Sequence, residues 1–252
     1  MMPFNNTVLL VVLGLIPSFL WMSFFIKKDV HPEPKSLITK VFLMGIIISP
    51  LAILFESGFT KISDYLSISV FAADSPSFFL WAAFVEEFIK FYAVRIVALS
   101  SPEFDEPVDA MIYMMVAALG FAAIENILVL FKTIPDGAQA TLTVWTLRSM
   151  GATLLHALSS SLVGYFLAMA WFFREHHKKL VVIGLALATM FHFTFNMFLS
   201  STDDRVTGLA YATGLLLVMS FLVSLLFDKI RERHAQRSAQ LTGTEESDVT
   251  TA

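Results

Sequence analysis

A small set of acids, bases and amides lies inside stretches of sequence that are otherwise almost entirely apolar. Glu86 and Glu87 are adjacent, and Lys90 follows one helical turn later, in WAAFVEEFIKFYAVR at 81–95. Carboxylates, imidazoles and amides gathered in one pocket can activate water and stabilise an oxyanion, which is the chemistry of hydrolysis. Comparable apolar stretches further along the chain contain Glu125 with Asn126, His156, and His192 with Asn196.

The composition predicts what must hold these residues. Of the 252 residues, 56% are hydrophobic and 25 are Phe, and the mean hydropathy is +0.72. Soluble domains are about 45–50% apolar and break their apolar runs at amphipathic periods. Several runs here approach the roughly 20 apolar residues that cross a bilayer. The sequence therefore predicts an all-α, polytopic membrane protein, a bundle of about seven transmembrane helices.

The cysteine count and the first apolar segment limit the possible chemistry and the possible processing of the chain. No cysteine is present, which excludes disulfides, thiolate metal ligands and a cysteine nucleophile. The first apolar segment, 7–26, has no basic residue before it and no small-residue cleavage pattern after it. We therefore expect it to be a retained span and not a removed signal peptide.

The spans and domains can be placed to within a few residues. Residues 1–237 are expected to form a single transmembrane helical domain, and the small, polar stretch 238–252 a disordered cytoplasmic tail. The 143–173 segment exceeds the bilayer thickness, so it either tilts or leaves its first turn outside with Arg148 at the interface. The 56–75 connection could be a plain loop or a short amphipathic or re-entrant piece. The expected spans are 6–26, 37–55, 76–99, 108–131, 143–173, 180–200 and 206–227.

The distribution of basic residues predicts the orientation. Lys and Arg gather in cytoplasmic connections, and here they favour an amino terminus outside and a carboxyl terminus in the cytoplasm. The sparse side carries Lys61, Lys132, Arg205 and Arg148. The rich side carries Lys27, Lys28, Lys35, Arg174, Lys178, Lys179, Lys229, Arg231, Arg233 and Arg237.

The ionisable residues of four consecutive spans are expected at similar depth. A rise of 1.5 Å per residue puts Glu86 roughly 15 Å and Glu125 about 9 Å from the outer ends of their spans. The same count gives about 12 Å for His192 and about 20 Å or less for His156. Polar groups with a purely local role have no reason to coincide in depth, so we expect one buried polar chamber.

Two further points concern what the chamber contains. On the fifth span, His156 shares a face with Ser160 and Gly164, so it should point into the bundle, with Ser160 serving in packing. No metal site is assigned, because the HExxH arrangement is absent. A divalent metal such as zinc could still be held by ligands from separate helices, namely Glu86, Glu125, His156 and His192. Asp109, after Glu106 and Pro107, is interpreted as a helix start.

These residues resemble the motifs of a known family. EEFIK at 86–90 is similar to the EExxK motif of the PrsW intramembrane proteases, and FAAIEN at 121–126 is similar to their FxxxEN motif. The stretches around His156 and His192 resemble the two histidine motifs of that family. A more distant similarity is to the type II CAAX prenyl endopeptidase and bacteriocin-immunity superfamily, from which Glu125 and Lys90 depart.

The resemblance implies roles for the residues. Glu86 and Glu87 would activate the attacking water, with Glu86 favoured as the base and Lys90 on its face. His156 would assist the water or shuttle a proton, and Glu125 with Asn126 would complete the cluster. His192 and Asn196 would hold the oxyanion.

The resemblance also implies a substrate and a place in the cell. The substrate would be a membrane-anchored protein such as a single-span anti-sigma factor, in regulated proteolysis at a bacterial or archaeal cell membrane, with the lipid bilayer as the other partner and no nucleic acid. Two alternatives stay open on the residues alone. One is a proton-coupled transporter or channel, and the other is a non-catalytic membrane scaffold of the same fold.

Overall fold

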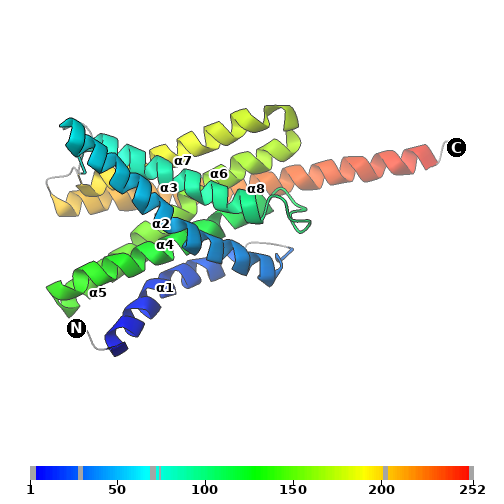
Figure 1. Cartoon of the computed structure of the whole chain (residues 1–252). Coiled ribbons are helices and arrows are strands. Elements are labelled where there is room, and N and C mark those ends of the chain that lie inside the picture. Colours follow the sequence, from blue (N-terminus) through cyan, green and yellow to red (C-terminus); the bar gives the residue numbers. More distant parts are fainter. Residues whose placement is uncertain (1–3, 28–30, 69–71, 74, 201–203, 250–252) are drawn as a thin grey trace.

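The structure is a computed structural model that describes residues 4–27, 31–68, 72–73, 75–200 and 204–249. Within these residues every regular element is helical, which confirms the predicted all-α fold (Figure 1). Lys28 of the orientation argument and residues 250–252 of the predicted tail lie outside the described part. The helices are α1 Phe4–Ile26, α2 Lys35–Leu66, α3 Pro76–Val97, α4 Asp109–Thr133, α5 Ala138–Leu147, α6 Thr153–Phe172, α7 His177–Ser200 and α8 Arg205–Val249.

Membrane-spanning character is clear for six segments of the described chain, by length and composition. They are 7–26, 35–66, 109–136, 138–172, 174–200 and 205–240. The predicted third span, α3, has 22 residues, which is long enough for a bilayer, but it carries four charged residues. All four lie in the 81–95 stretch, and three of them are Glu86, Glu87 and Lys90. The seven-span topology and its orientation remain predictions.

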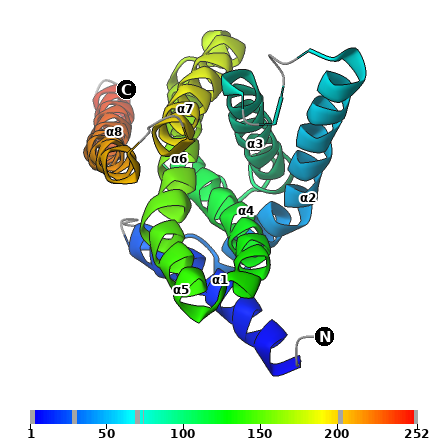
Figure 2. The same ribbon diagram turned by 90° about the vertical axis from the view of Figure 1, so that its left-hand side faces the viewer.

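Helix α4 lies at the centre of the bundle, against α1, α2 and α6 (Figure 2). Small residues permit this, because helices in a bilayer associate by close backbone packing. At the crossing of α2 and α4, a Cβ on Gly45 would collide with the carbonyl oxygen of Ala117. A Cβ on Gly120 would collide in the same way with the carbonyl oxygen of Phe42. This close crossing holds α4 in place, and with it Glu125 and Asn126 toward the carboxyl end of the helix.

Three connections differ in detail from the sequence expectation. The 56–75 stretch begins as helix, because α2 continues to Leu66 and ends where Ser67 adopts a left-handed conformation with φ of 53°. The 143–173 segment is not one straight helix, because a π-helical turn at Arg148–Ala152 separates α5 from α6. Helix α8 continues to Val249, through most of the segment for which the sequence predicts disorder. The division into domains remains a prediction.

The expected start of the fourth span is found. Helix α4 begins at Asp109, whose Oδ2 accepts the backbone N–H groups of Asp105 and Glu106 at 3.2 and 2.8 Å. The carboxylate thus fixes the preceding loop and takes no part in the polar chamber. At the same end of α4, the Tyr113 hydroxyl donates a hydrogen bond to Glu33 of the segment before α2.

Candidate active site

Four helices bring the predicted polar residues into one cluster. Helix α3 contributes two glutamates and a lysine, α4 a glutamate and an asparagine, and α6 and α7 one histidine each. All of them except Glu125 are buried. The convergence expected from span depth is therefore present in the structure, although their chemical roles remain predictions. The members of the cluster are Glu86, Glu87, Lys90, Glu125, Asn126, His156 and His192.

The local sequence of α3 sets the direction of its two glutamates. Ser75 caps the helix by accepting the N–H of Phe78 at 3.2 Å, and Pro76 occupies the first turn, where no N–H is needed. From this start, Glu86 and Glu87 point about 100° apart around the helix. They therefore meet different partners.

Glu87 is held by four donors from three helices. Its Oε1 lies 3.0 Å from Lys90 Nζ, 2.9 Å from Ser159 Oγ and 3.0 Å from His192 Nδ1. Its Oε2 accepts a 2.6 Å hydrogen bond from Ser160. A carboxylate with both oxygens engaged in this way is a poor candidate for a free base, although the role predicted for Glu87 is untested.

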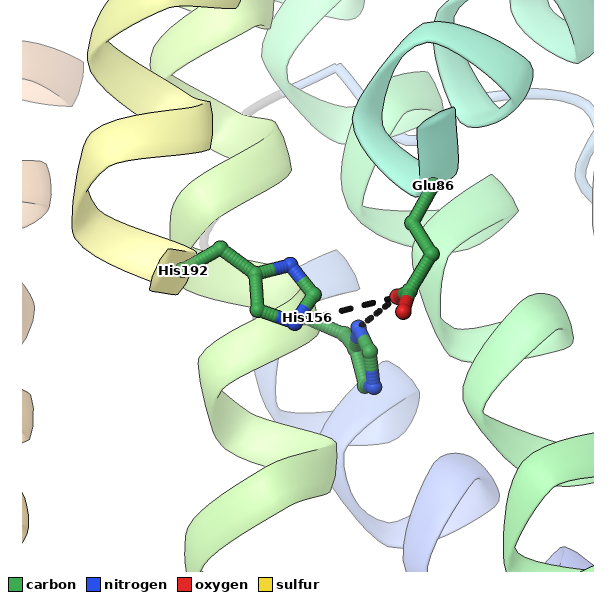
Figure 3. A group of neighbouring side chains, drawn as sticks. All are labelled: Glu86, His156 and His192. Carbon is green, nitrogen blue, oxygen red and sulfur yellow. Dashed lines mark ion pairs between the residues drawn. The ribbon is translucent and has the colours of Figure 1, made fainter. Parts of the chain in front are cut away.

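Glu86 faces both histidines, and Figure 3 shows the two rings turned toward its carboxylate. Its Oε2 lies 3.6 Å from His156 Nδ1 and 3.7 Å from His192 Nε2. The two imidazole rings are nearly perpendicular, with centroids 5.0 Å apart. One ligand atom from each of the three residues lies within 4.8 Å of the other two. Three such atoms are close enough together to be ligands of one ion, which would take the place of the Lys90 Nζ contacts with His156 Nδ1 and Glu86 Oε2.

Lys90 is the internal cation of the cluster and is completely buried. Its Nζ lies 3.3 Å from Glu86 Oε2 and 2.8 Å from His156 Nδ1, and it sits over the Phe121 ring at 4.6 Å. The shorter glutamate contact is with Glu87 and not with the expected Glu86. Lys90 therefore contacts both glutamates. Its hydrogen bond to His156 is to Nδ1, the ring nitrogen that faces Glu86.

A second chain of polar groups leads from the cluster toward its rim. His156 Nε2 lies 2.8 Å from Glu125 Oε2, and Arg148 Nη2 donates to the same oxygen at 3.1 Å. Arg148 Nε also donates to Asn126 Oδ1 at 2.7 Å, while Asn126 Nδ2 donates to Thr153. The side chains of Glu125 and Arg148 are 28% and 21% exposed, so this is the accessible end of the cluster.

Several residues are placed differently from the expectation. Arg148, for which the membrane interface is one of two expected positions, is the first residue of the π turn and donates to Glu125. Ser160, assigned to packing, donates to Glu87. Asn196 is half-buried one turn beyond His192, and within the described part of the chain its side chain has no hydrogen bond to the cluster. Glu56 of α2 was missed: it interacts electrostatically with Glu86, Glu125 and Lys90.

Comparison with known proteins gives the site its context. The model of the PrsW family of intramembrane metalloproteases matches residues 33–226. The chain belongs to this family. A protein named Protease PrsW from Oceanobacillus iheyensis is 29% identical over 186 residues, which cover 74% of this chain and 80% of that protein. Protease PrsW from Bacillus subtilis is 24% identical over 230 residues, covering 90% and 95%. No solved structure matches the chain.

The PrsW-family chain is therefore a protease embedded in the membrane. The cluster lies on four helices that fall wholly within the matched residues. The family is described as metalloproteases, and the buried Glu86, His156 and His192 form a group that could hold a metal ion. The predicted protease function is confirmed at this level.

Proposed function

We propose that this PrsW-family protease hydrolyses a peptide bond of a membrane-anchored protein at a divalent metal held by Glu86, His156 and His192. The observation that carries the proposal is the grouping of one carboxylate and two imidazole donors within 4.8 Å. Two histidines and one glutamate are the ligands of a well-known class of catalytic zinc site, which keeps one position open for water or substrate. When bound, the metal supplies Lewis-acid polarisation of water and of the scissile carbonyl.

Two further features support the fit of a dication. Glu87 holds His192 by its Nδ1, which leaves Nε2 toward Glu86, the carboxylate–histidine arrangement that usually orients a metal ligand. The formal charge of the cluster also suits a divalent cation. Four carboxylates against two cations leave −2 when the histidines are neutral, which one such ion balances. The groups counted are Glu56, Glu86, Glu87, Glu125, Lys90 and Arg148.

The remaining residues then have distinct tasks. A carboxylate that binds the metal is not free to act as the base, so the role predicted for Glu86 passes to Glu125. Glu125 is partly exposed and hydrogen-bonded to His156 Nε2. Arg148 keeps Glu125 at the rim, and Lys90 keeps Glu87 charged and oriented.

The substrate is proposed from the membrane location and the resemblance. A single-span anti-sigma factor is the class that the resemblance implies, cut toward its extracytoplasmic side. The excess of Lys and Arg on one side of the membrane supports an amino terminus outside, with the site in the outer half of the bilayer.

A reconstituted assay tests the proposal. Purified protein in lipid vesicles is combined with a single-span anti-sigma substrate, and zinc content is measured by elemental analysis. We expect one metal ion per chain, cleavage that a chelator abolishes and zinc restores, and loss of both metal and cleavage in Glu86→Gln and His192→Ala.

The matched control is His176→Ala, because this exposed histidine lies in the turn before α7. It should retain metal and activity. Full cleavage by Glu86→Gln, or by chelated wild-type protein with no bound metal, would exclude the proposed site.

A further inference from the structure

A long apolar groove lies beside the cluster and has no part in the functions assigned above. It has a volume of about 980 Å³ and is bounded by α1, the bend between α5 and α6, α7 and α8. Figure 2 shows α8 to one side of α6, with α1 and α5 below it. We call it the α1–α8 groove, defined by Trp21, Phe25, Gly151, Phe195 and the stretch of α8 between Arg205 and Phe227.

The length of the groove matches the bilayer. Arg205 and Phe227 both line it, and the 22 steps between them span about 33 Å of helix. The hydrocarbon core of a bilayer is about 30 Å thick. The groove therefore runs along the full depth of the membrane, as an extra transmembrane helix would.

The lining of the groove favours a helix over lipid. Helix α8 lines the groove in part with Ala212, Leu216 and Val223, which are buried. Its groove side carries Ser220 and Ser224 among apolar neighbours. Small hydroxyl residues on a membrane helix permit close approach and hydrogen bonding by a second helix, whereas lipid chains gain nothing from them.

The groove lies next to the cluster, and residues that line it contact or adjoin members of the cluster. Arg148 lines the groove and also donates hydrogen bonds to Glu125 and Asn126. Phe195 lines it three residues after His192 on the same helix. The intervening π turn is fixed against α1 by a 2.8 Å hydrogen bond from Trp21 Nε1 to the Ser149 carbonyl. Such π turns are frequently found at functional sites.

We infer that the α1–α8 groove docks the transmembrane helix of the substrate, an inference that rests on the proposed function. Arg205 and Arg148 line its outer part; Arg148 is paired with Glu125, so an acidic residue just beyond the end of the substrate helix complements Arg205. The cluster lies near that end, since Arg148 lines the groove and donates to Glu125. About 23 Å of groove continues along α8 from Ala212 to Phe227 and holds the uncut part of the helix.

Disulfide cross-linking tests this directly, because the chain has no cysteine of its own. Ser220→Cys places one thiol in the groove. Val218→Cys is the control, because Val218 is 62% exposed on the same helix and does not line the groove. The probe is a synthetic Leu/Ala single-span peptide with a central cysteine, with Asp at one flank and Lys at the other, in phosphatidylcholine vesicles oxidised with iodine.

We expect roughly tenfold more disulfide adduct with Ser220→Cys than with Val218→Cys. A docked peptide holds its cysteine beside position 220, whereas a freely diffusing peptide meets both positions equally. We also expect a several-fold decrease when Lys replaces the Asp flank. Equal yields at the two positions mean random collision in lipid, or a groove filled by lipid, and overturn the inference. So does an absence of adduct at Ser220→Cys.

The same measurement in the Glu86→Gln background separates the two proposals, because docking needs no turnover. If the protein with Glu86 intact forms the adduct but binds no metal and shows no cleavage, the proposed function is refuted and the docking site is not. Cleavage of the peptide without a preference for Ser220→Cys refutes the docking site alone.

Discussion

Replacement of Glu87 by glutamine tests whether this residue orients the site. Glu87 pairs with His192 Nδ1 at 3.0 Å and accepts from Lys90, Ser159 and Ser160. Glutamine keeps the size of the side chain but removes the charge and one acceptor. Loss of the group that orients a ligating histidine typically costs 10–100-fold in metal affinity. We therefore expect Glu87→Gln to weaken zinc binding by about 1.4–2.7 kcal/mol.

Zinc affinity is measured by competition with a fluorescent chelator on purified protein in detergent. Glu86→Gln, which removes a proposed ligand, should lose more affinity than Glu87→Gln. Glu33→Gln is the matched control, since Glu33 is also a buried carboxylate but accepts from Tyr113 at the opposite end of α4. If Glu87→Gln binds zinc as tightly as wild type, or more weakly than Glu86→Gln, the proposed division between ligand and positioning residue is wrong.

Three further variants test the packing and the hydrogen bonds that hold the cluster. Gly120→Val should lower the thermal midpoint in detergent sharply because its side chain collides with α2, whereas Gly58→Val, with open space around it, should not. Lys90→Met leaves buried carboxylates without their cation and should cost about 3–5 kcal/mol, seen in the same melt; an unchanged midpoint would mean that Lys90 is not required for stability. Ser160→Ala removes a bond to a charged carboxylate and should reduce the free energy of unfolding by about 1.5–3 kcal/mol. The control for Ser160→Ala is Ser161→Ala, whose hydroxyl bonds only its own helix; equal losses in the two variants would contradict the special role of Ser160.

The sequence predicts the convergence of the cluster better than its connections. Ionisable residues are costly in a bilayer, so their depth in each span carries information about where they must meet. Similar depth in four spans predicts that Glu86, Glu125, His156 and His192 meet, and the structure has them in contact or within a few ångströms. It cannot distinguish Glu86 from Glu87, because adjacent residues share a depth and differ only in direction.

Arg148 and Glu56 illustrate what the sequence does not contain. A basic residue near the end of a long span is normally at the interface, whereas Arg148 begins a π turn and donates to Glu125. Helical periodicity does not reveal a one-turn change of this kind. Glu56 lies in a stretch of mixed polarity, so the continuation of α2 to Leu66 had no clear signal.

The hydrogen bonds of Glu87 have a consequence for biogenesis. This carboxylate on α3 is bonded to α6 and α7, and its last partner, His192, is synthesised more than 100 residues later. A nascent chain that has inserted only its first helices holds Glu86 and Glu87 without either histidine. Under the proposed function, in which His192 binds the metal, the protease becomes competent only once α7 has entered the bilayer, and neighbouring membrane proteins are protected from an unfinished enzyme.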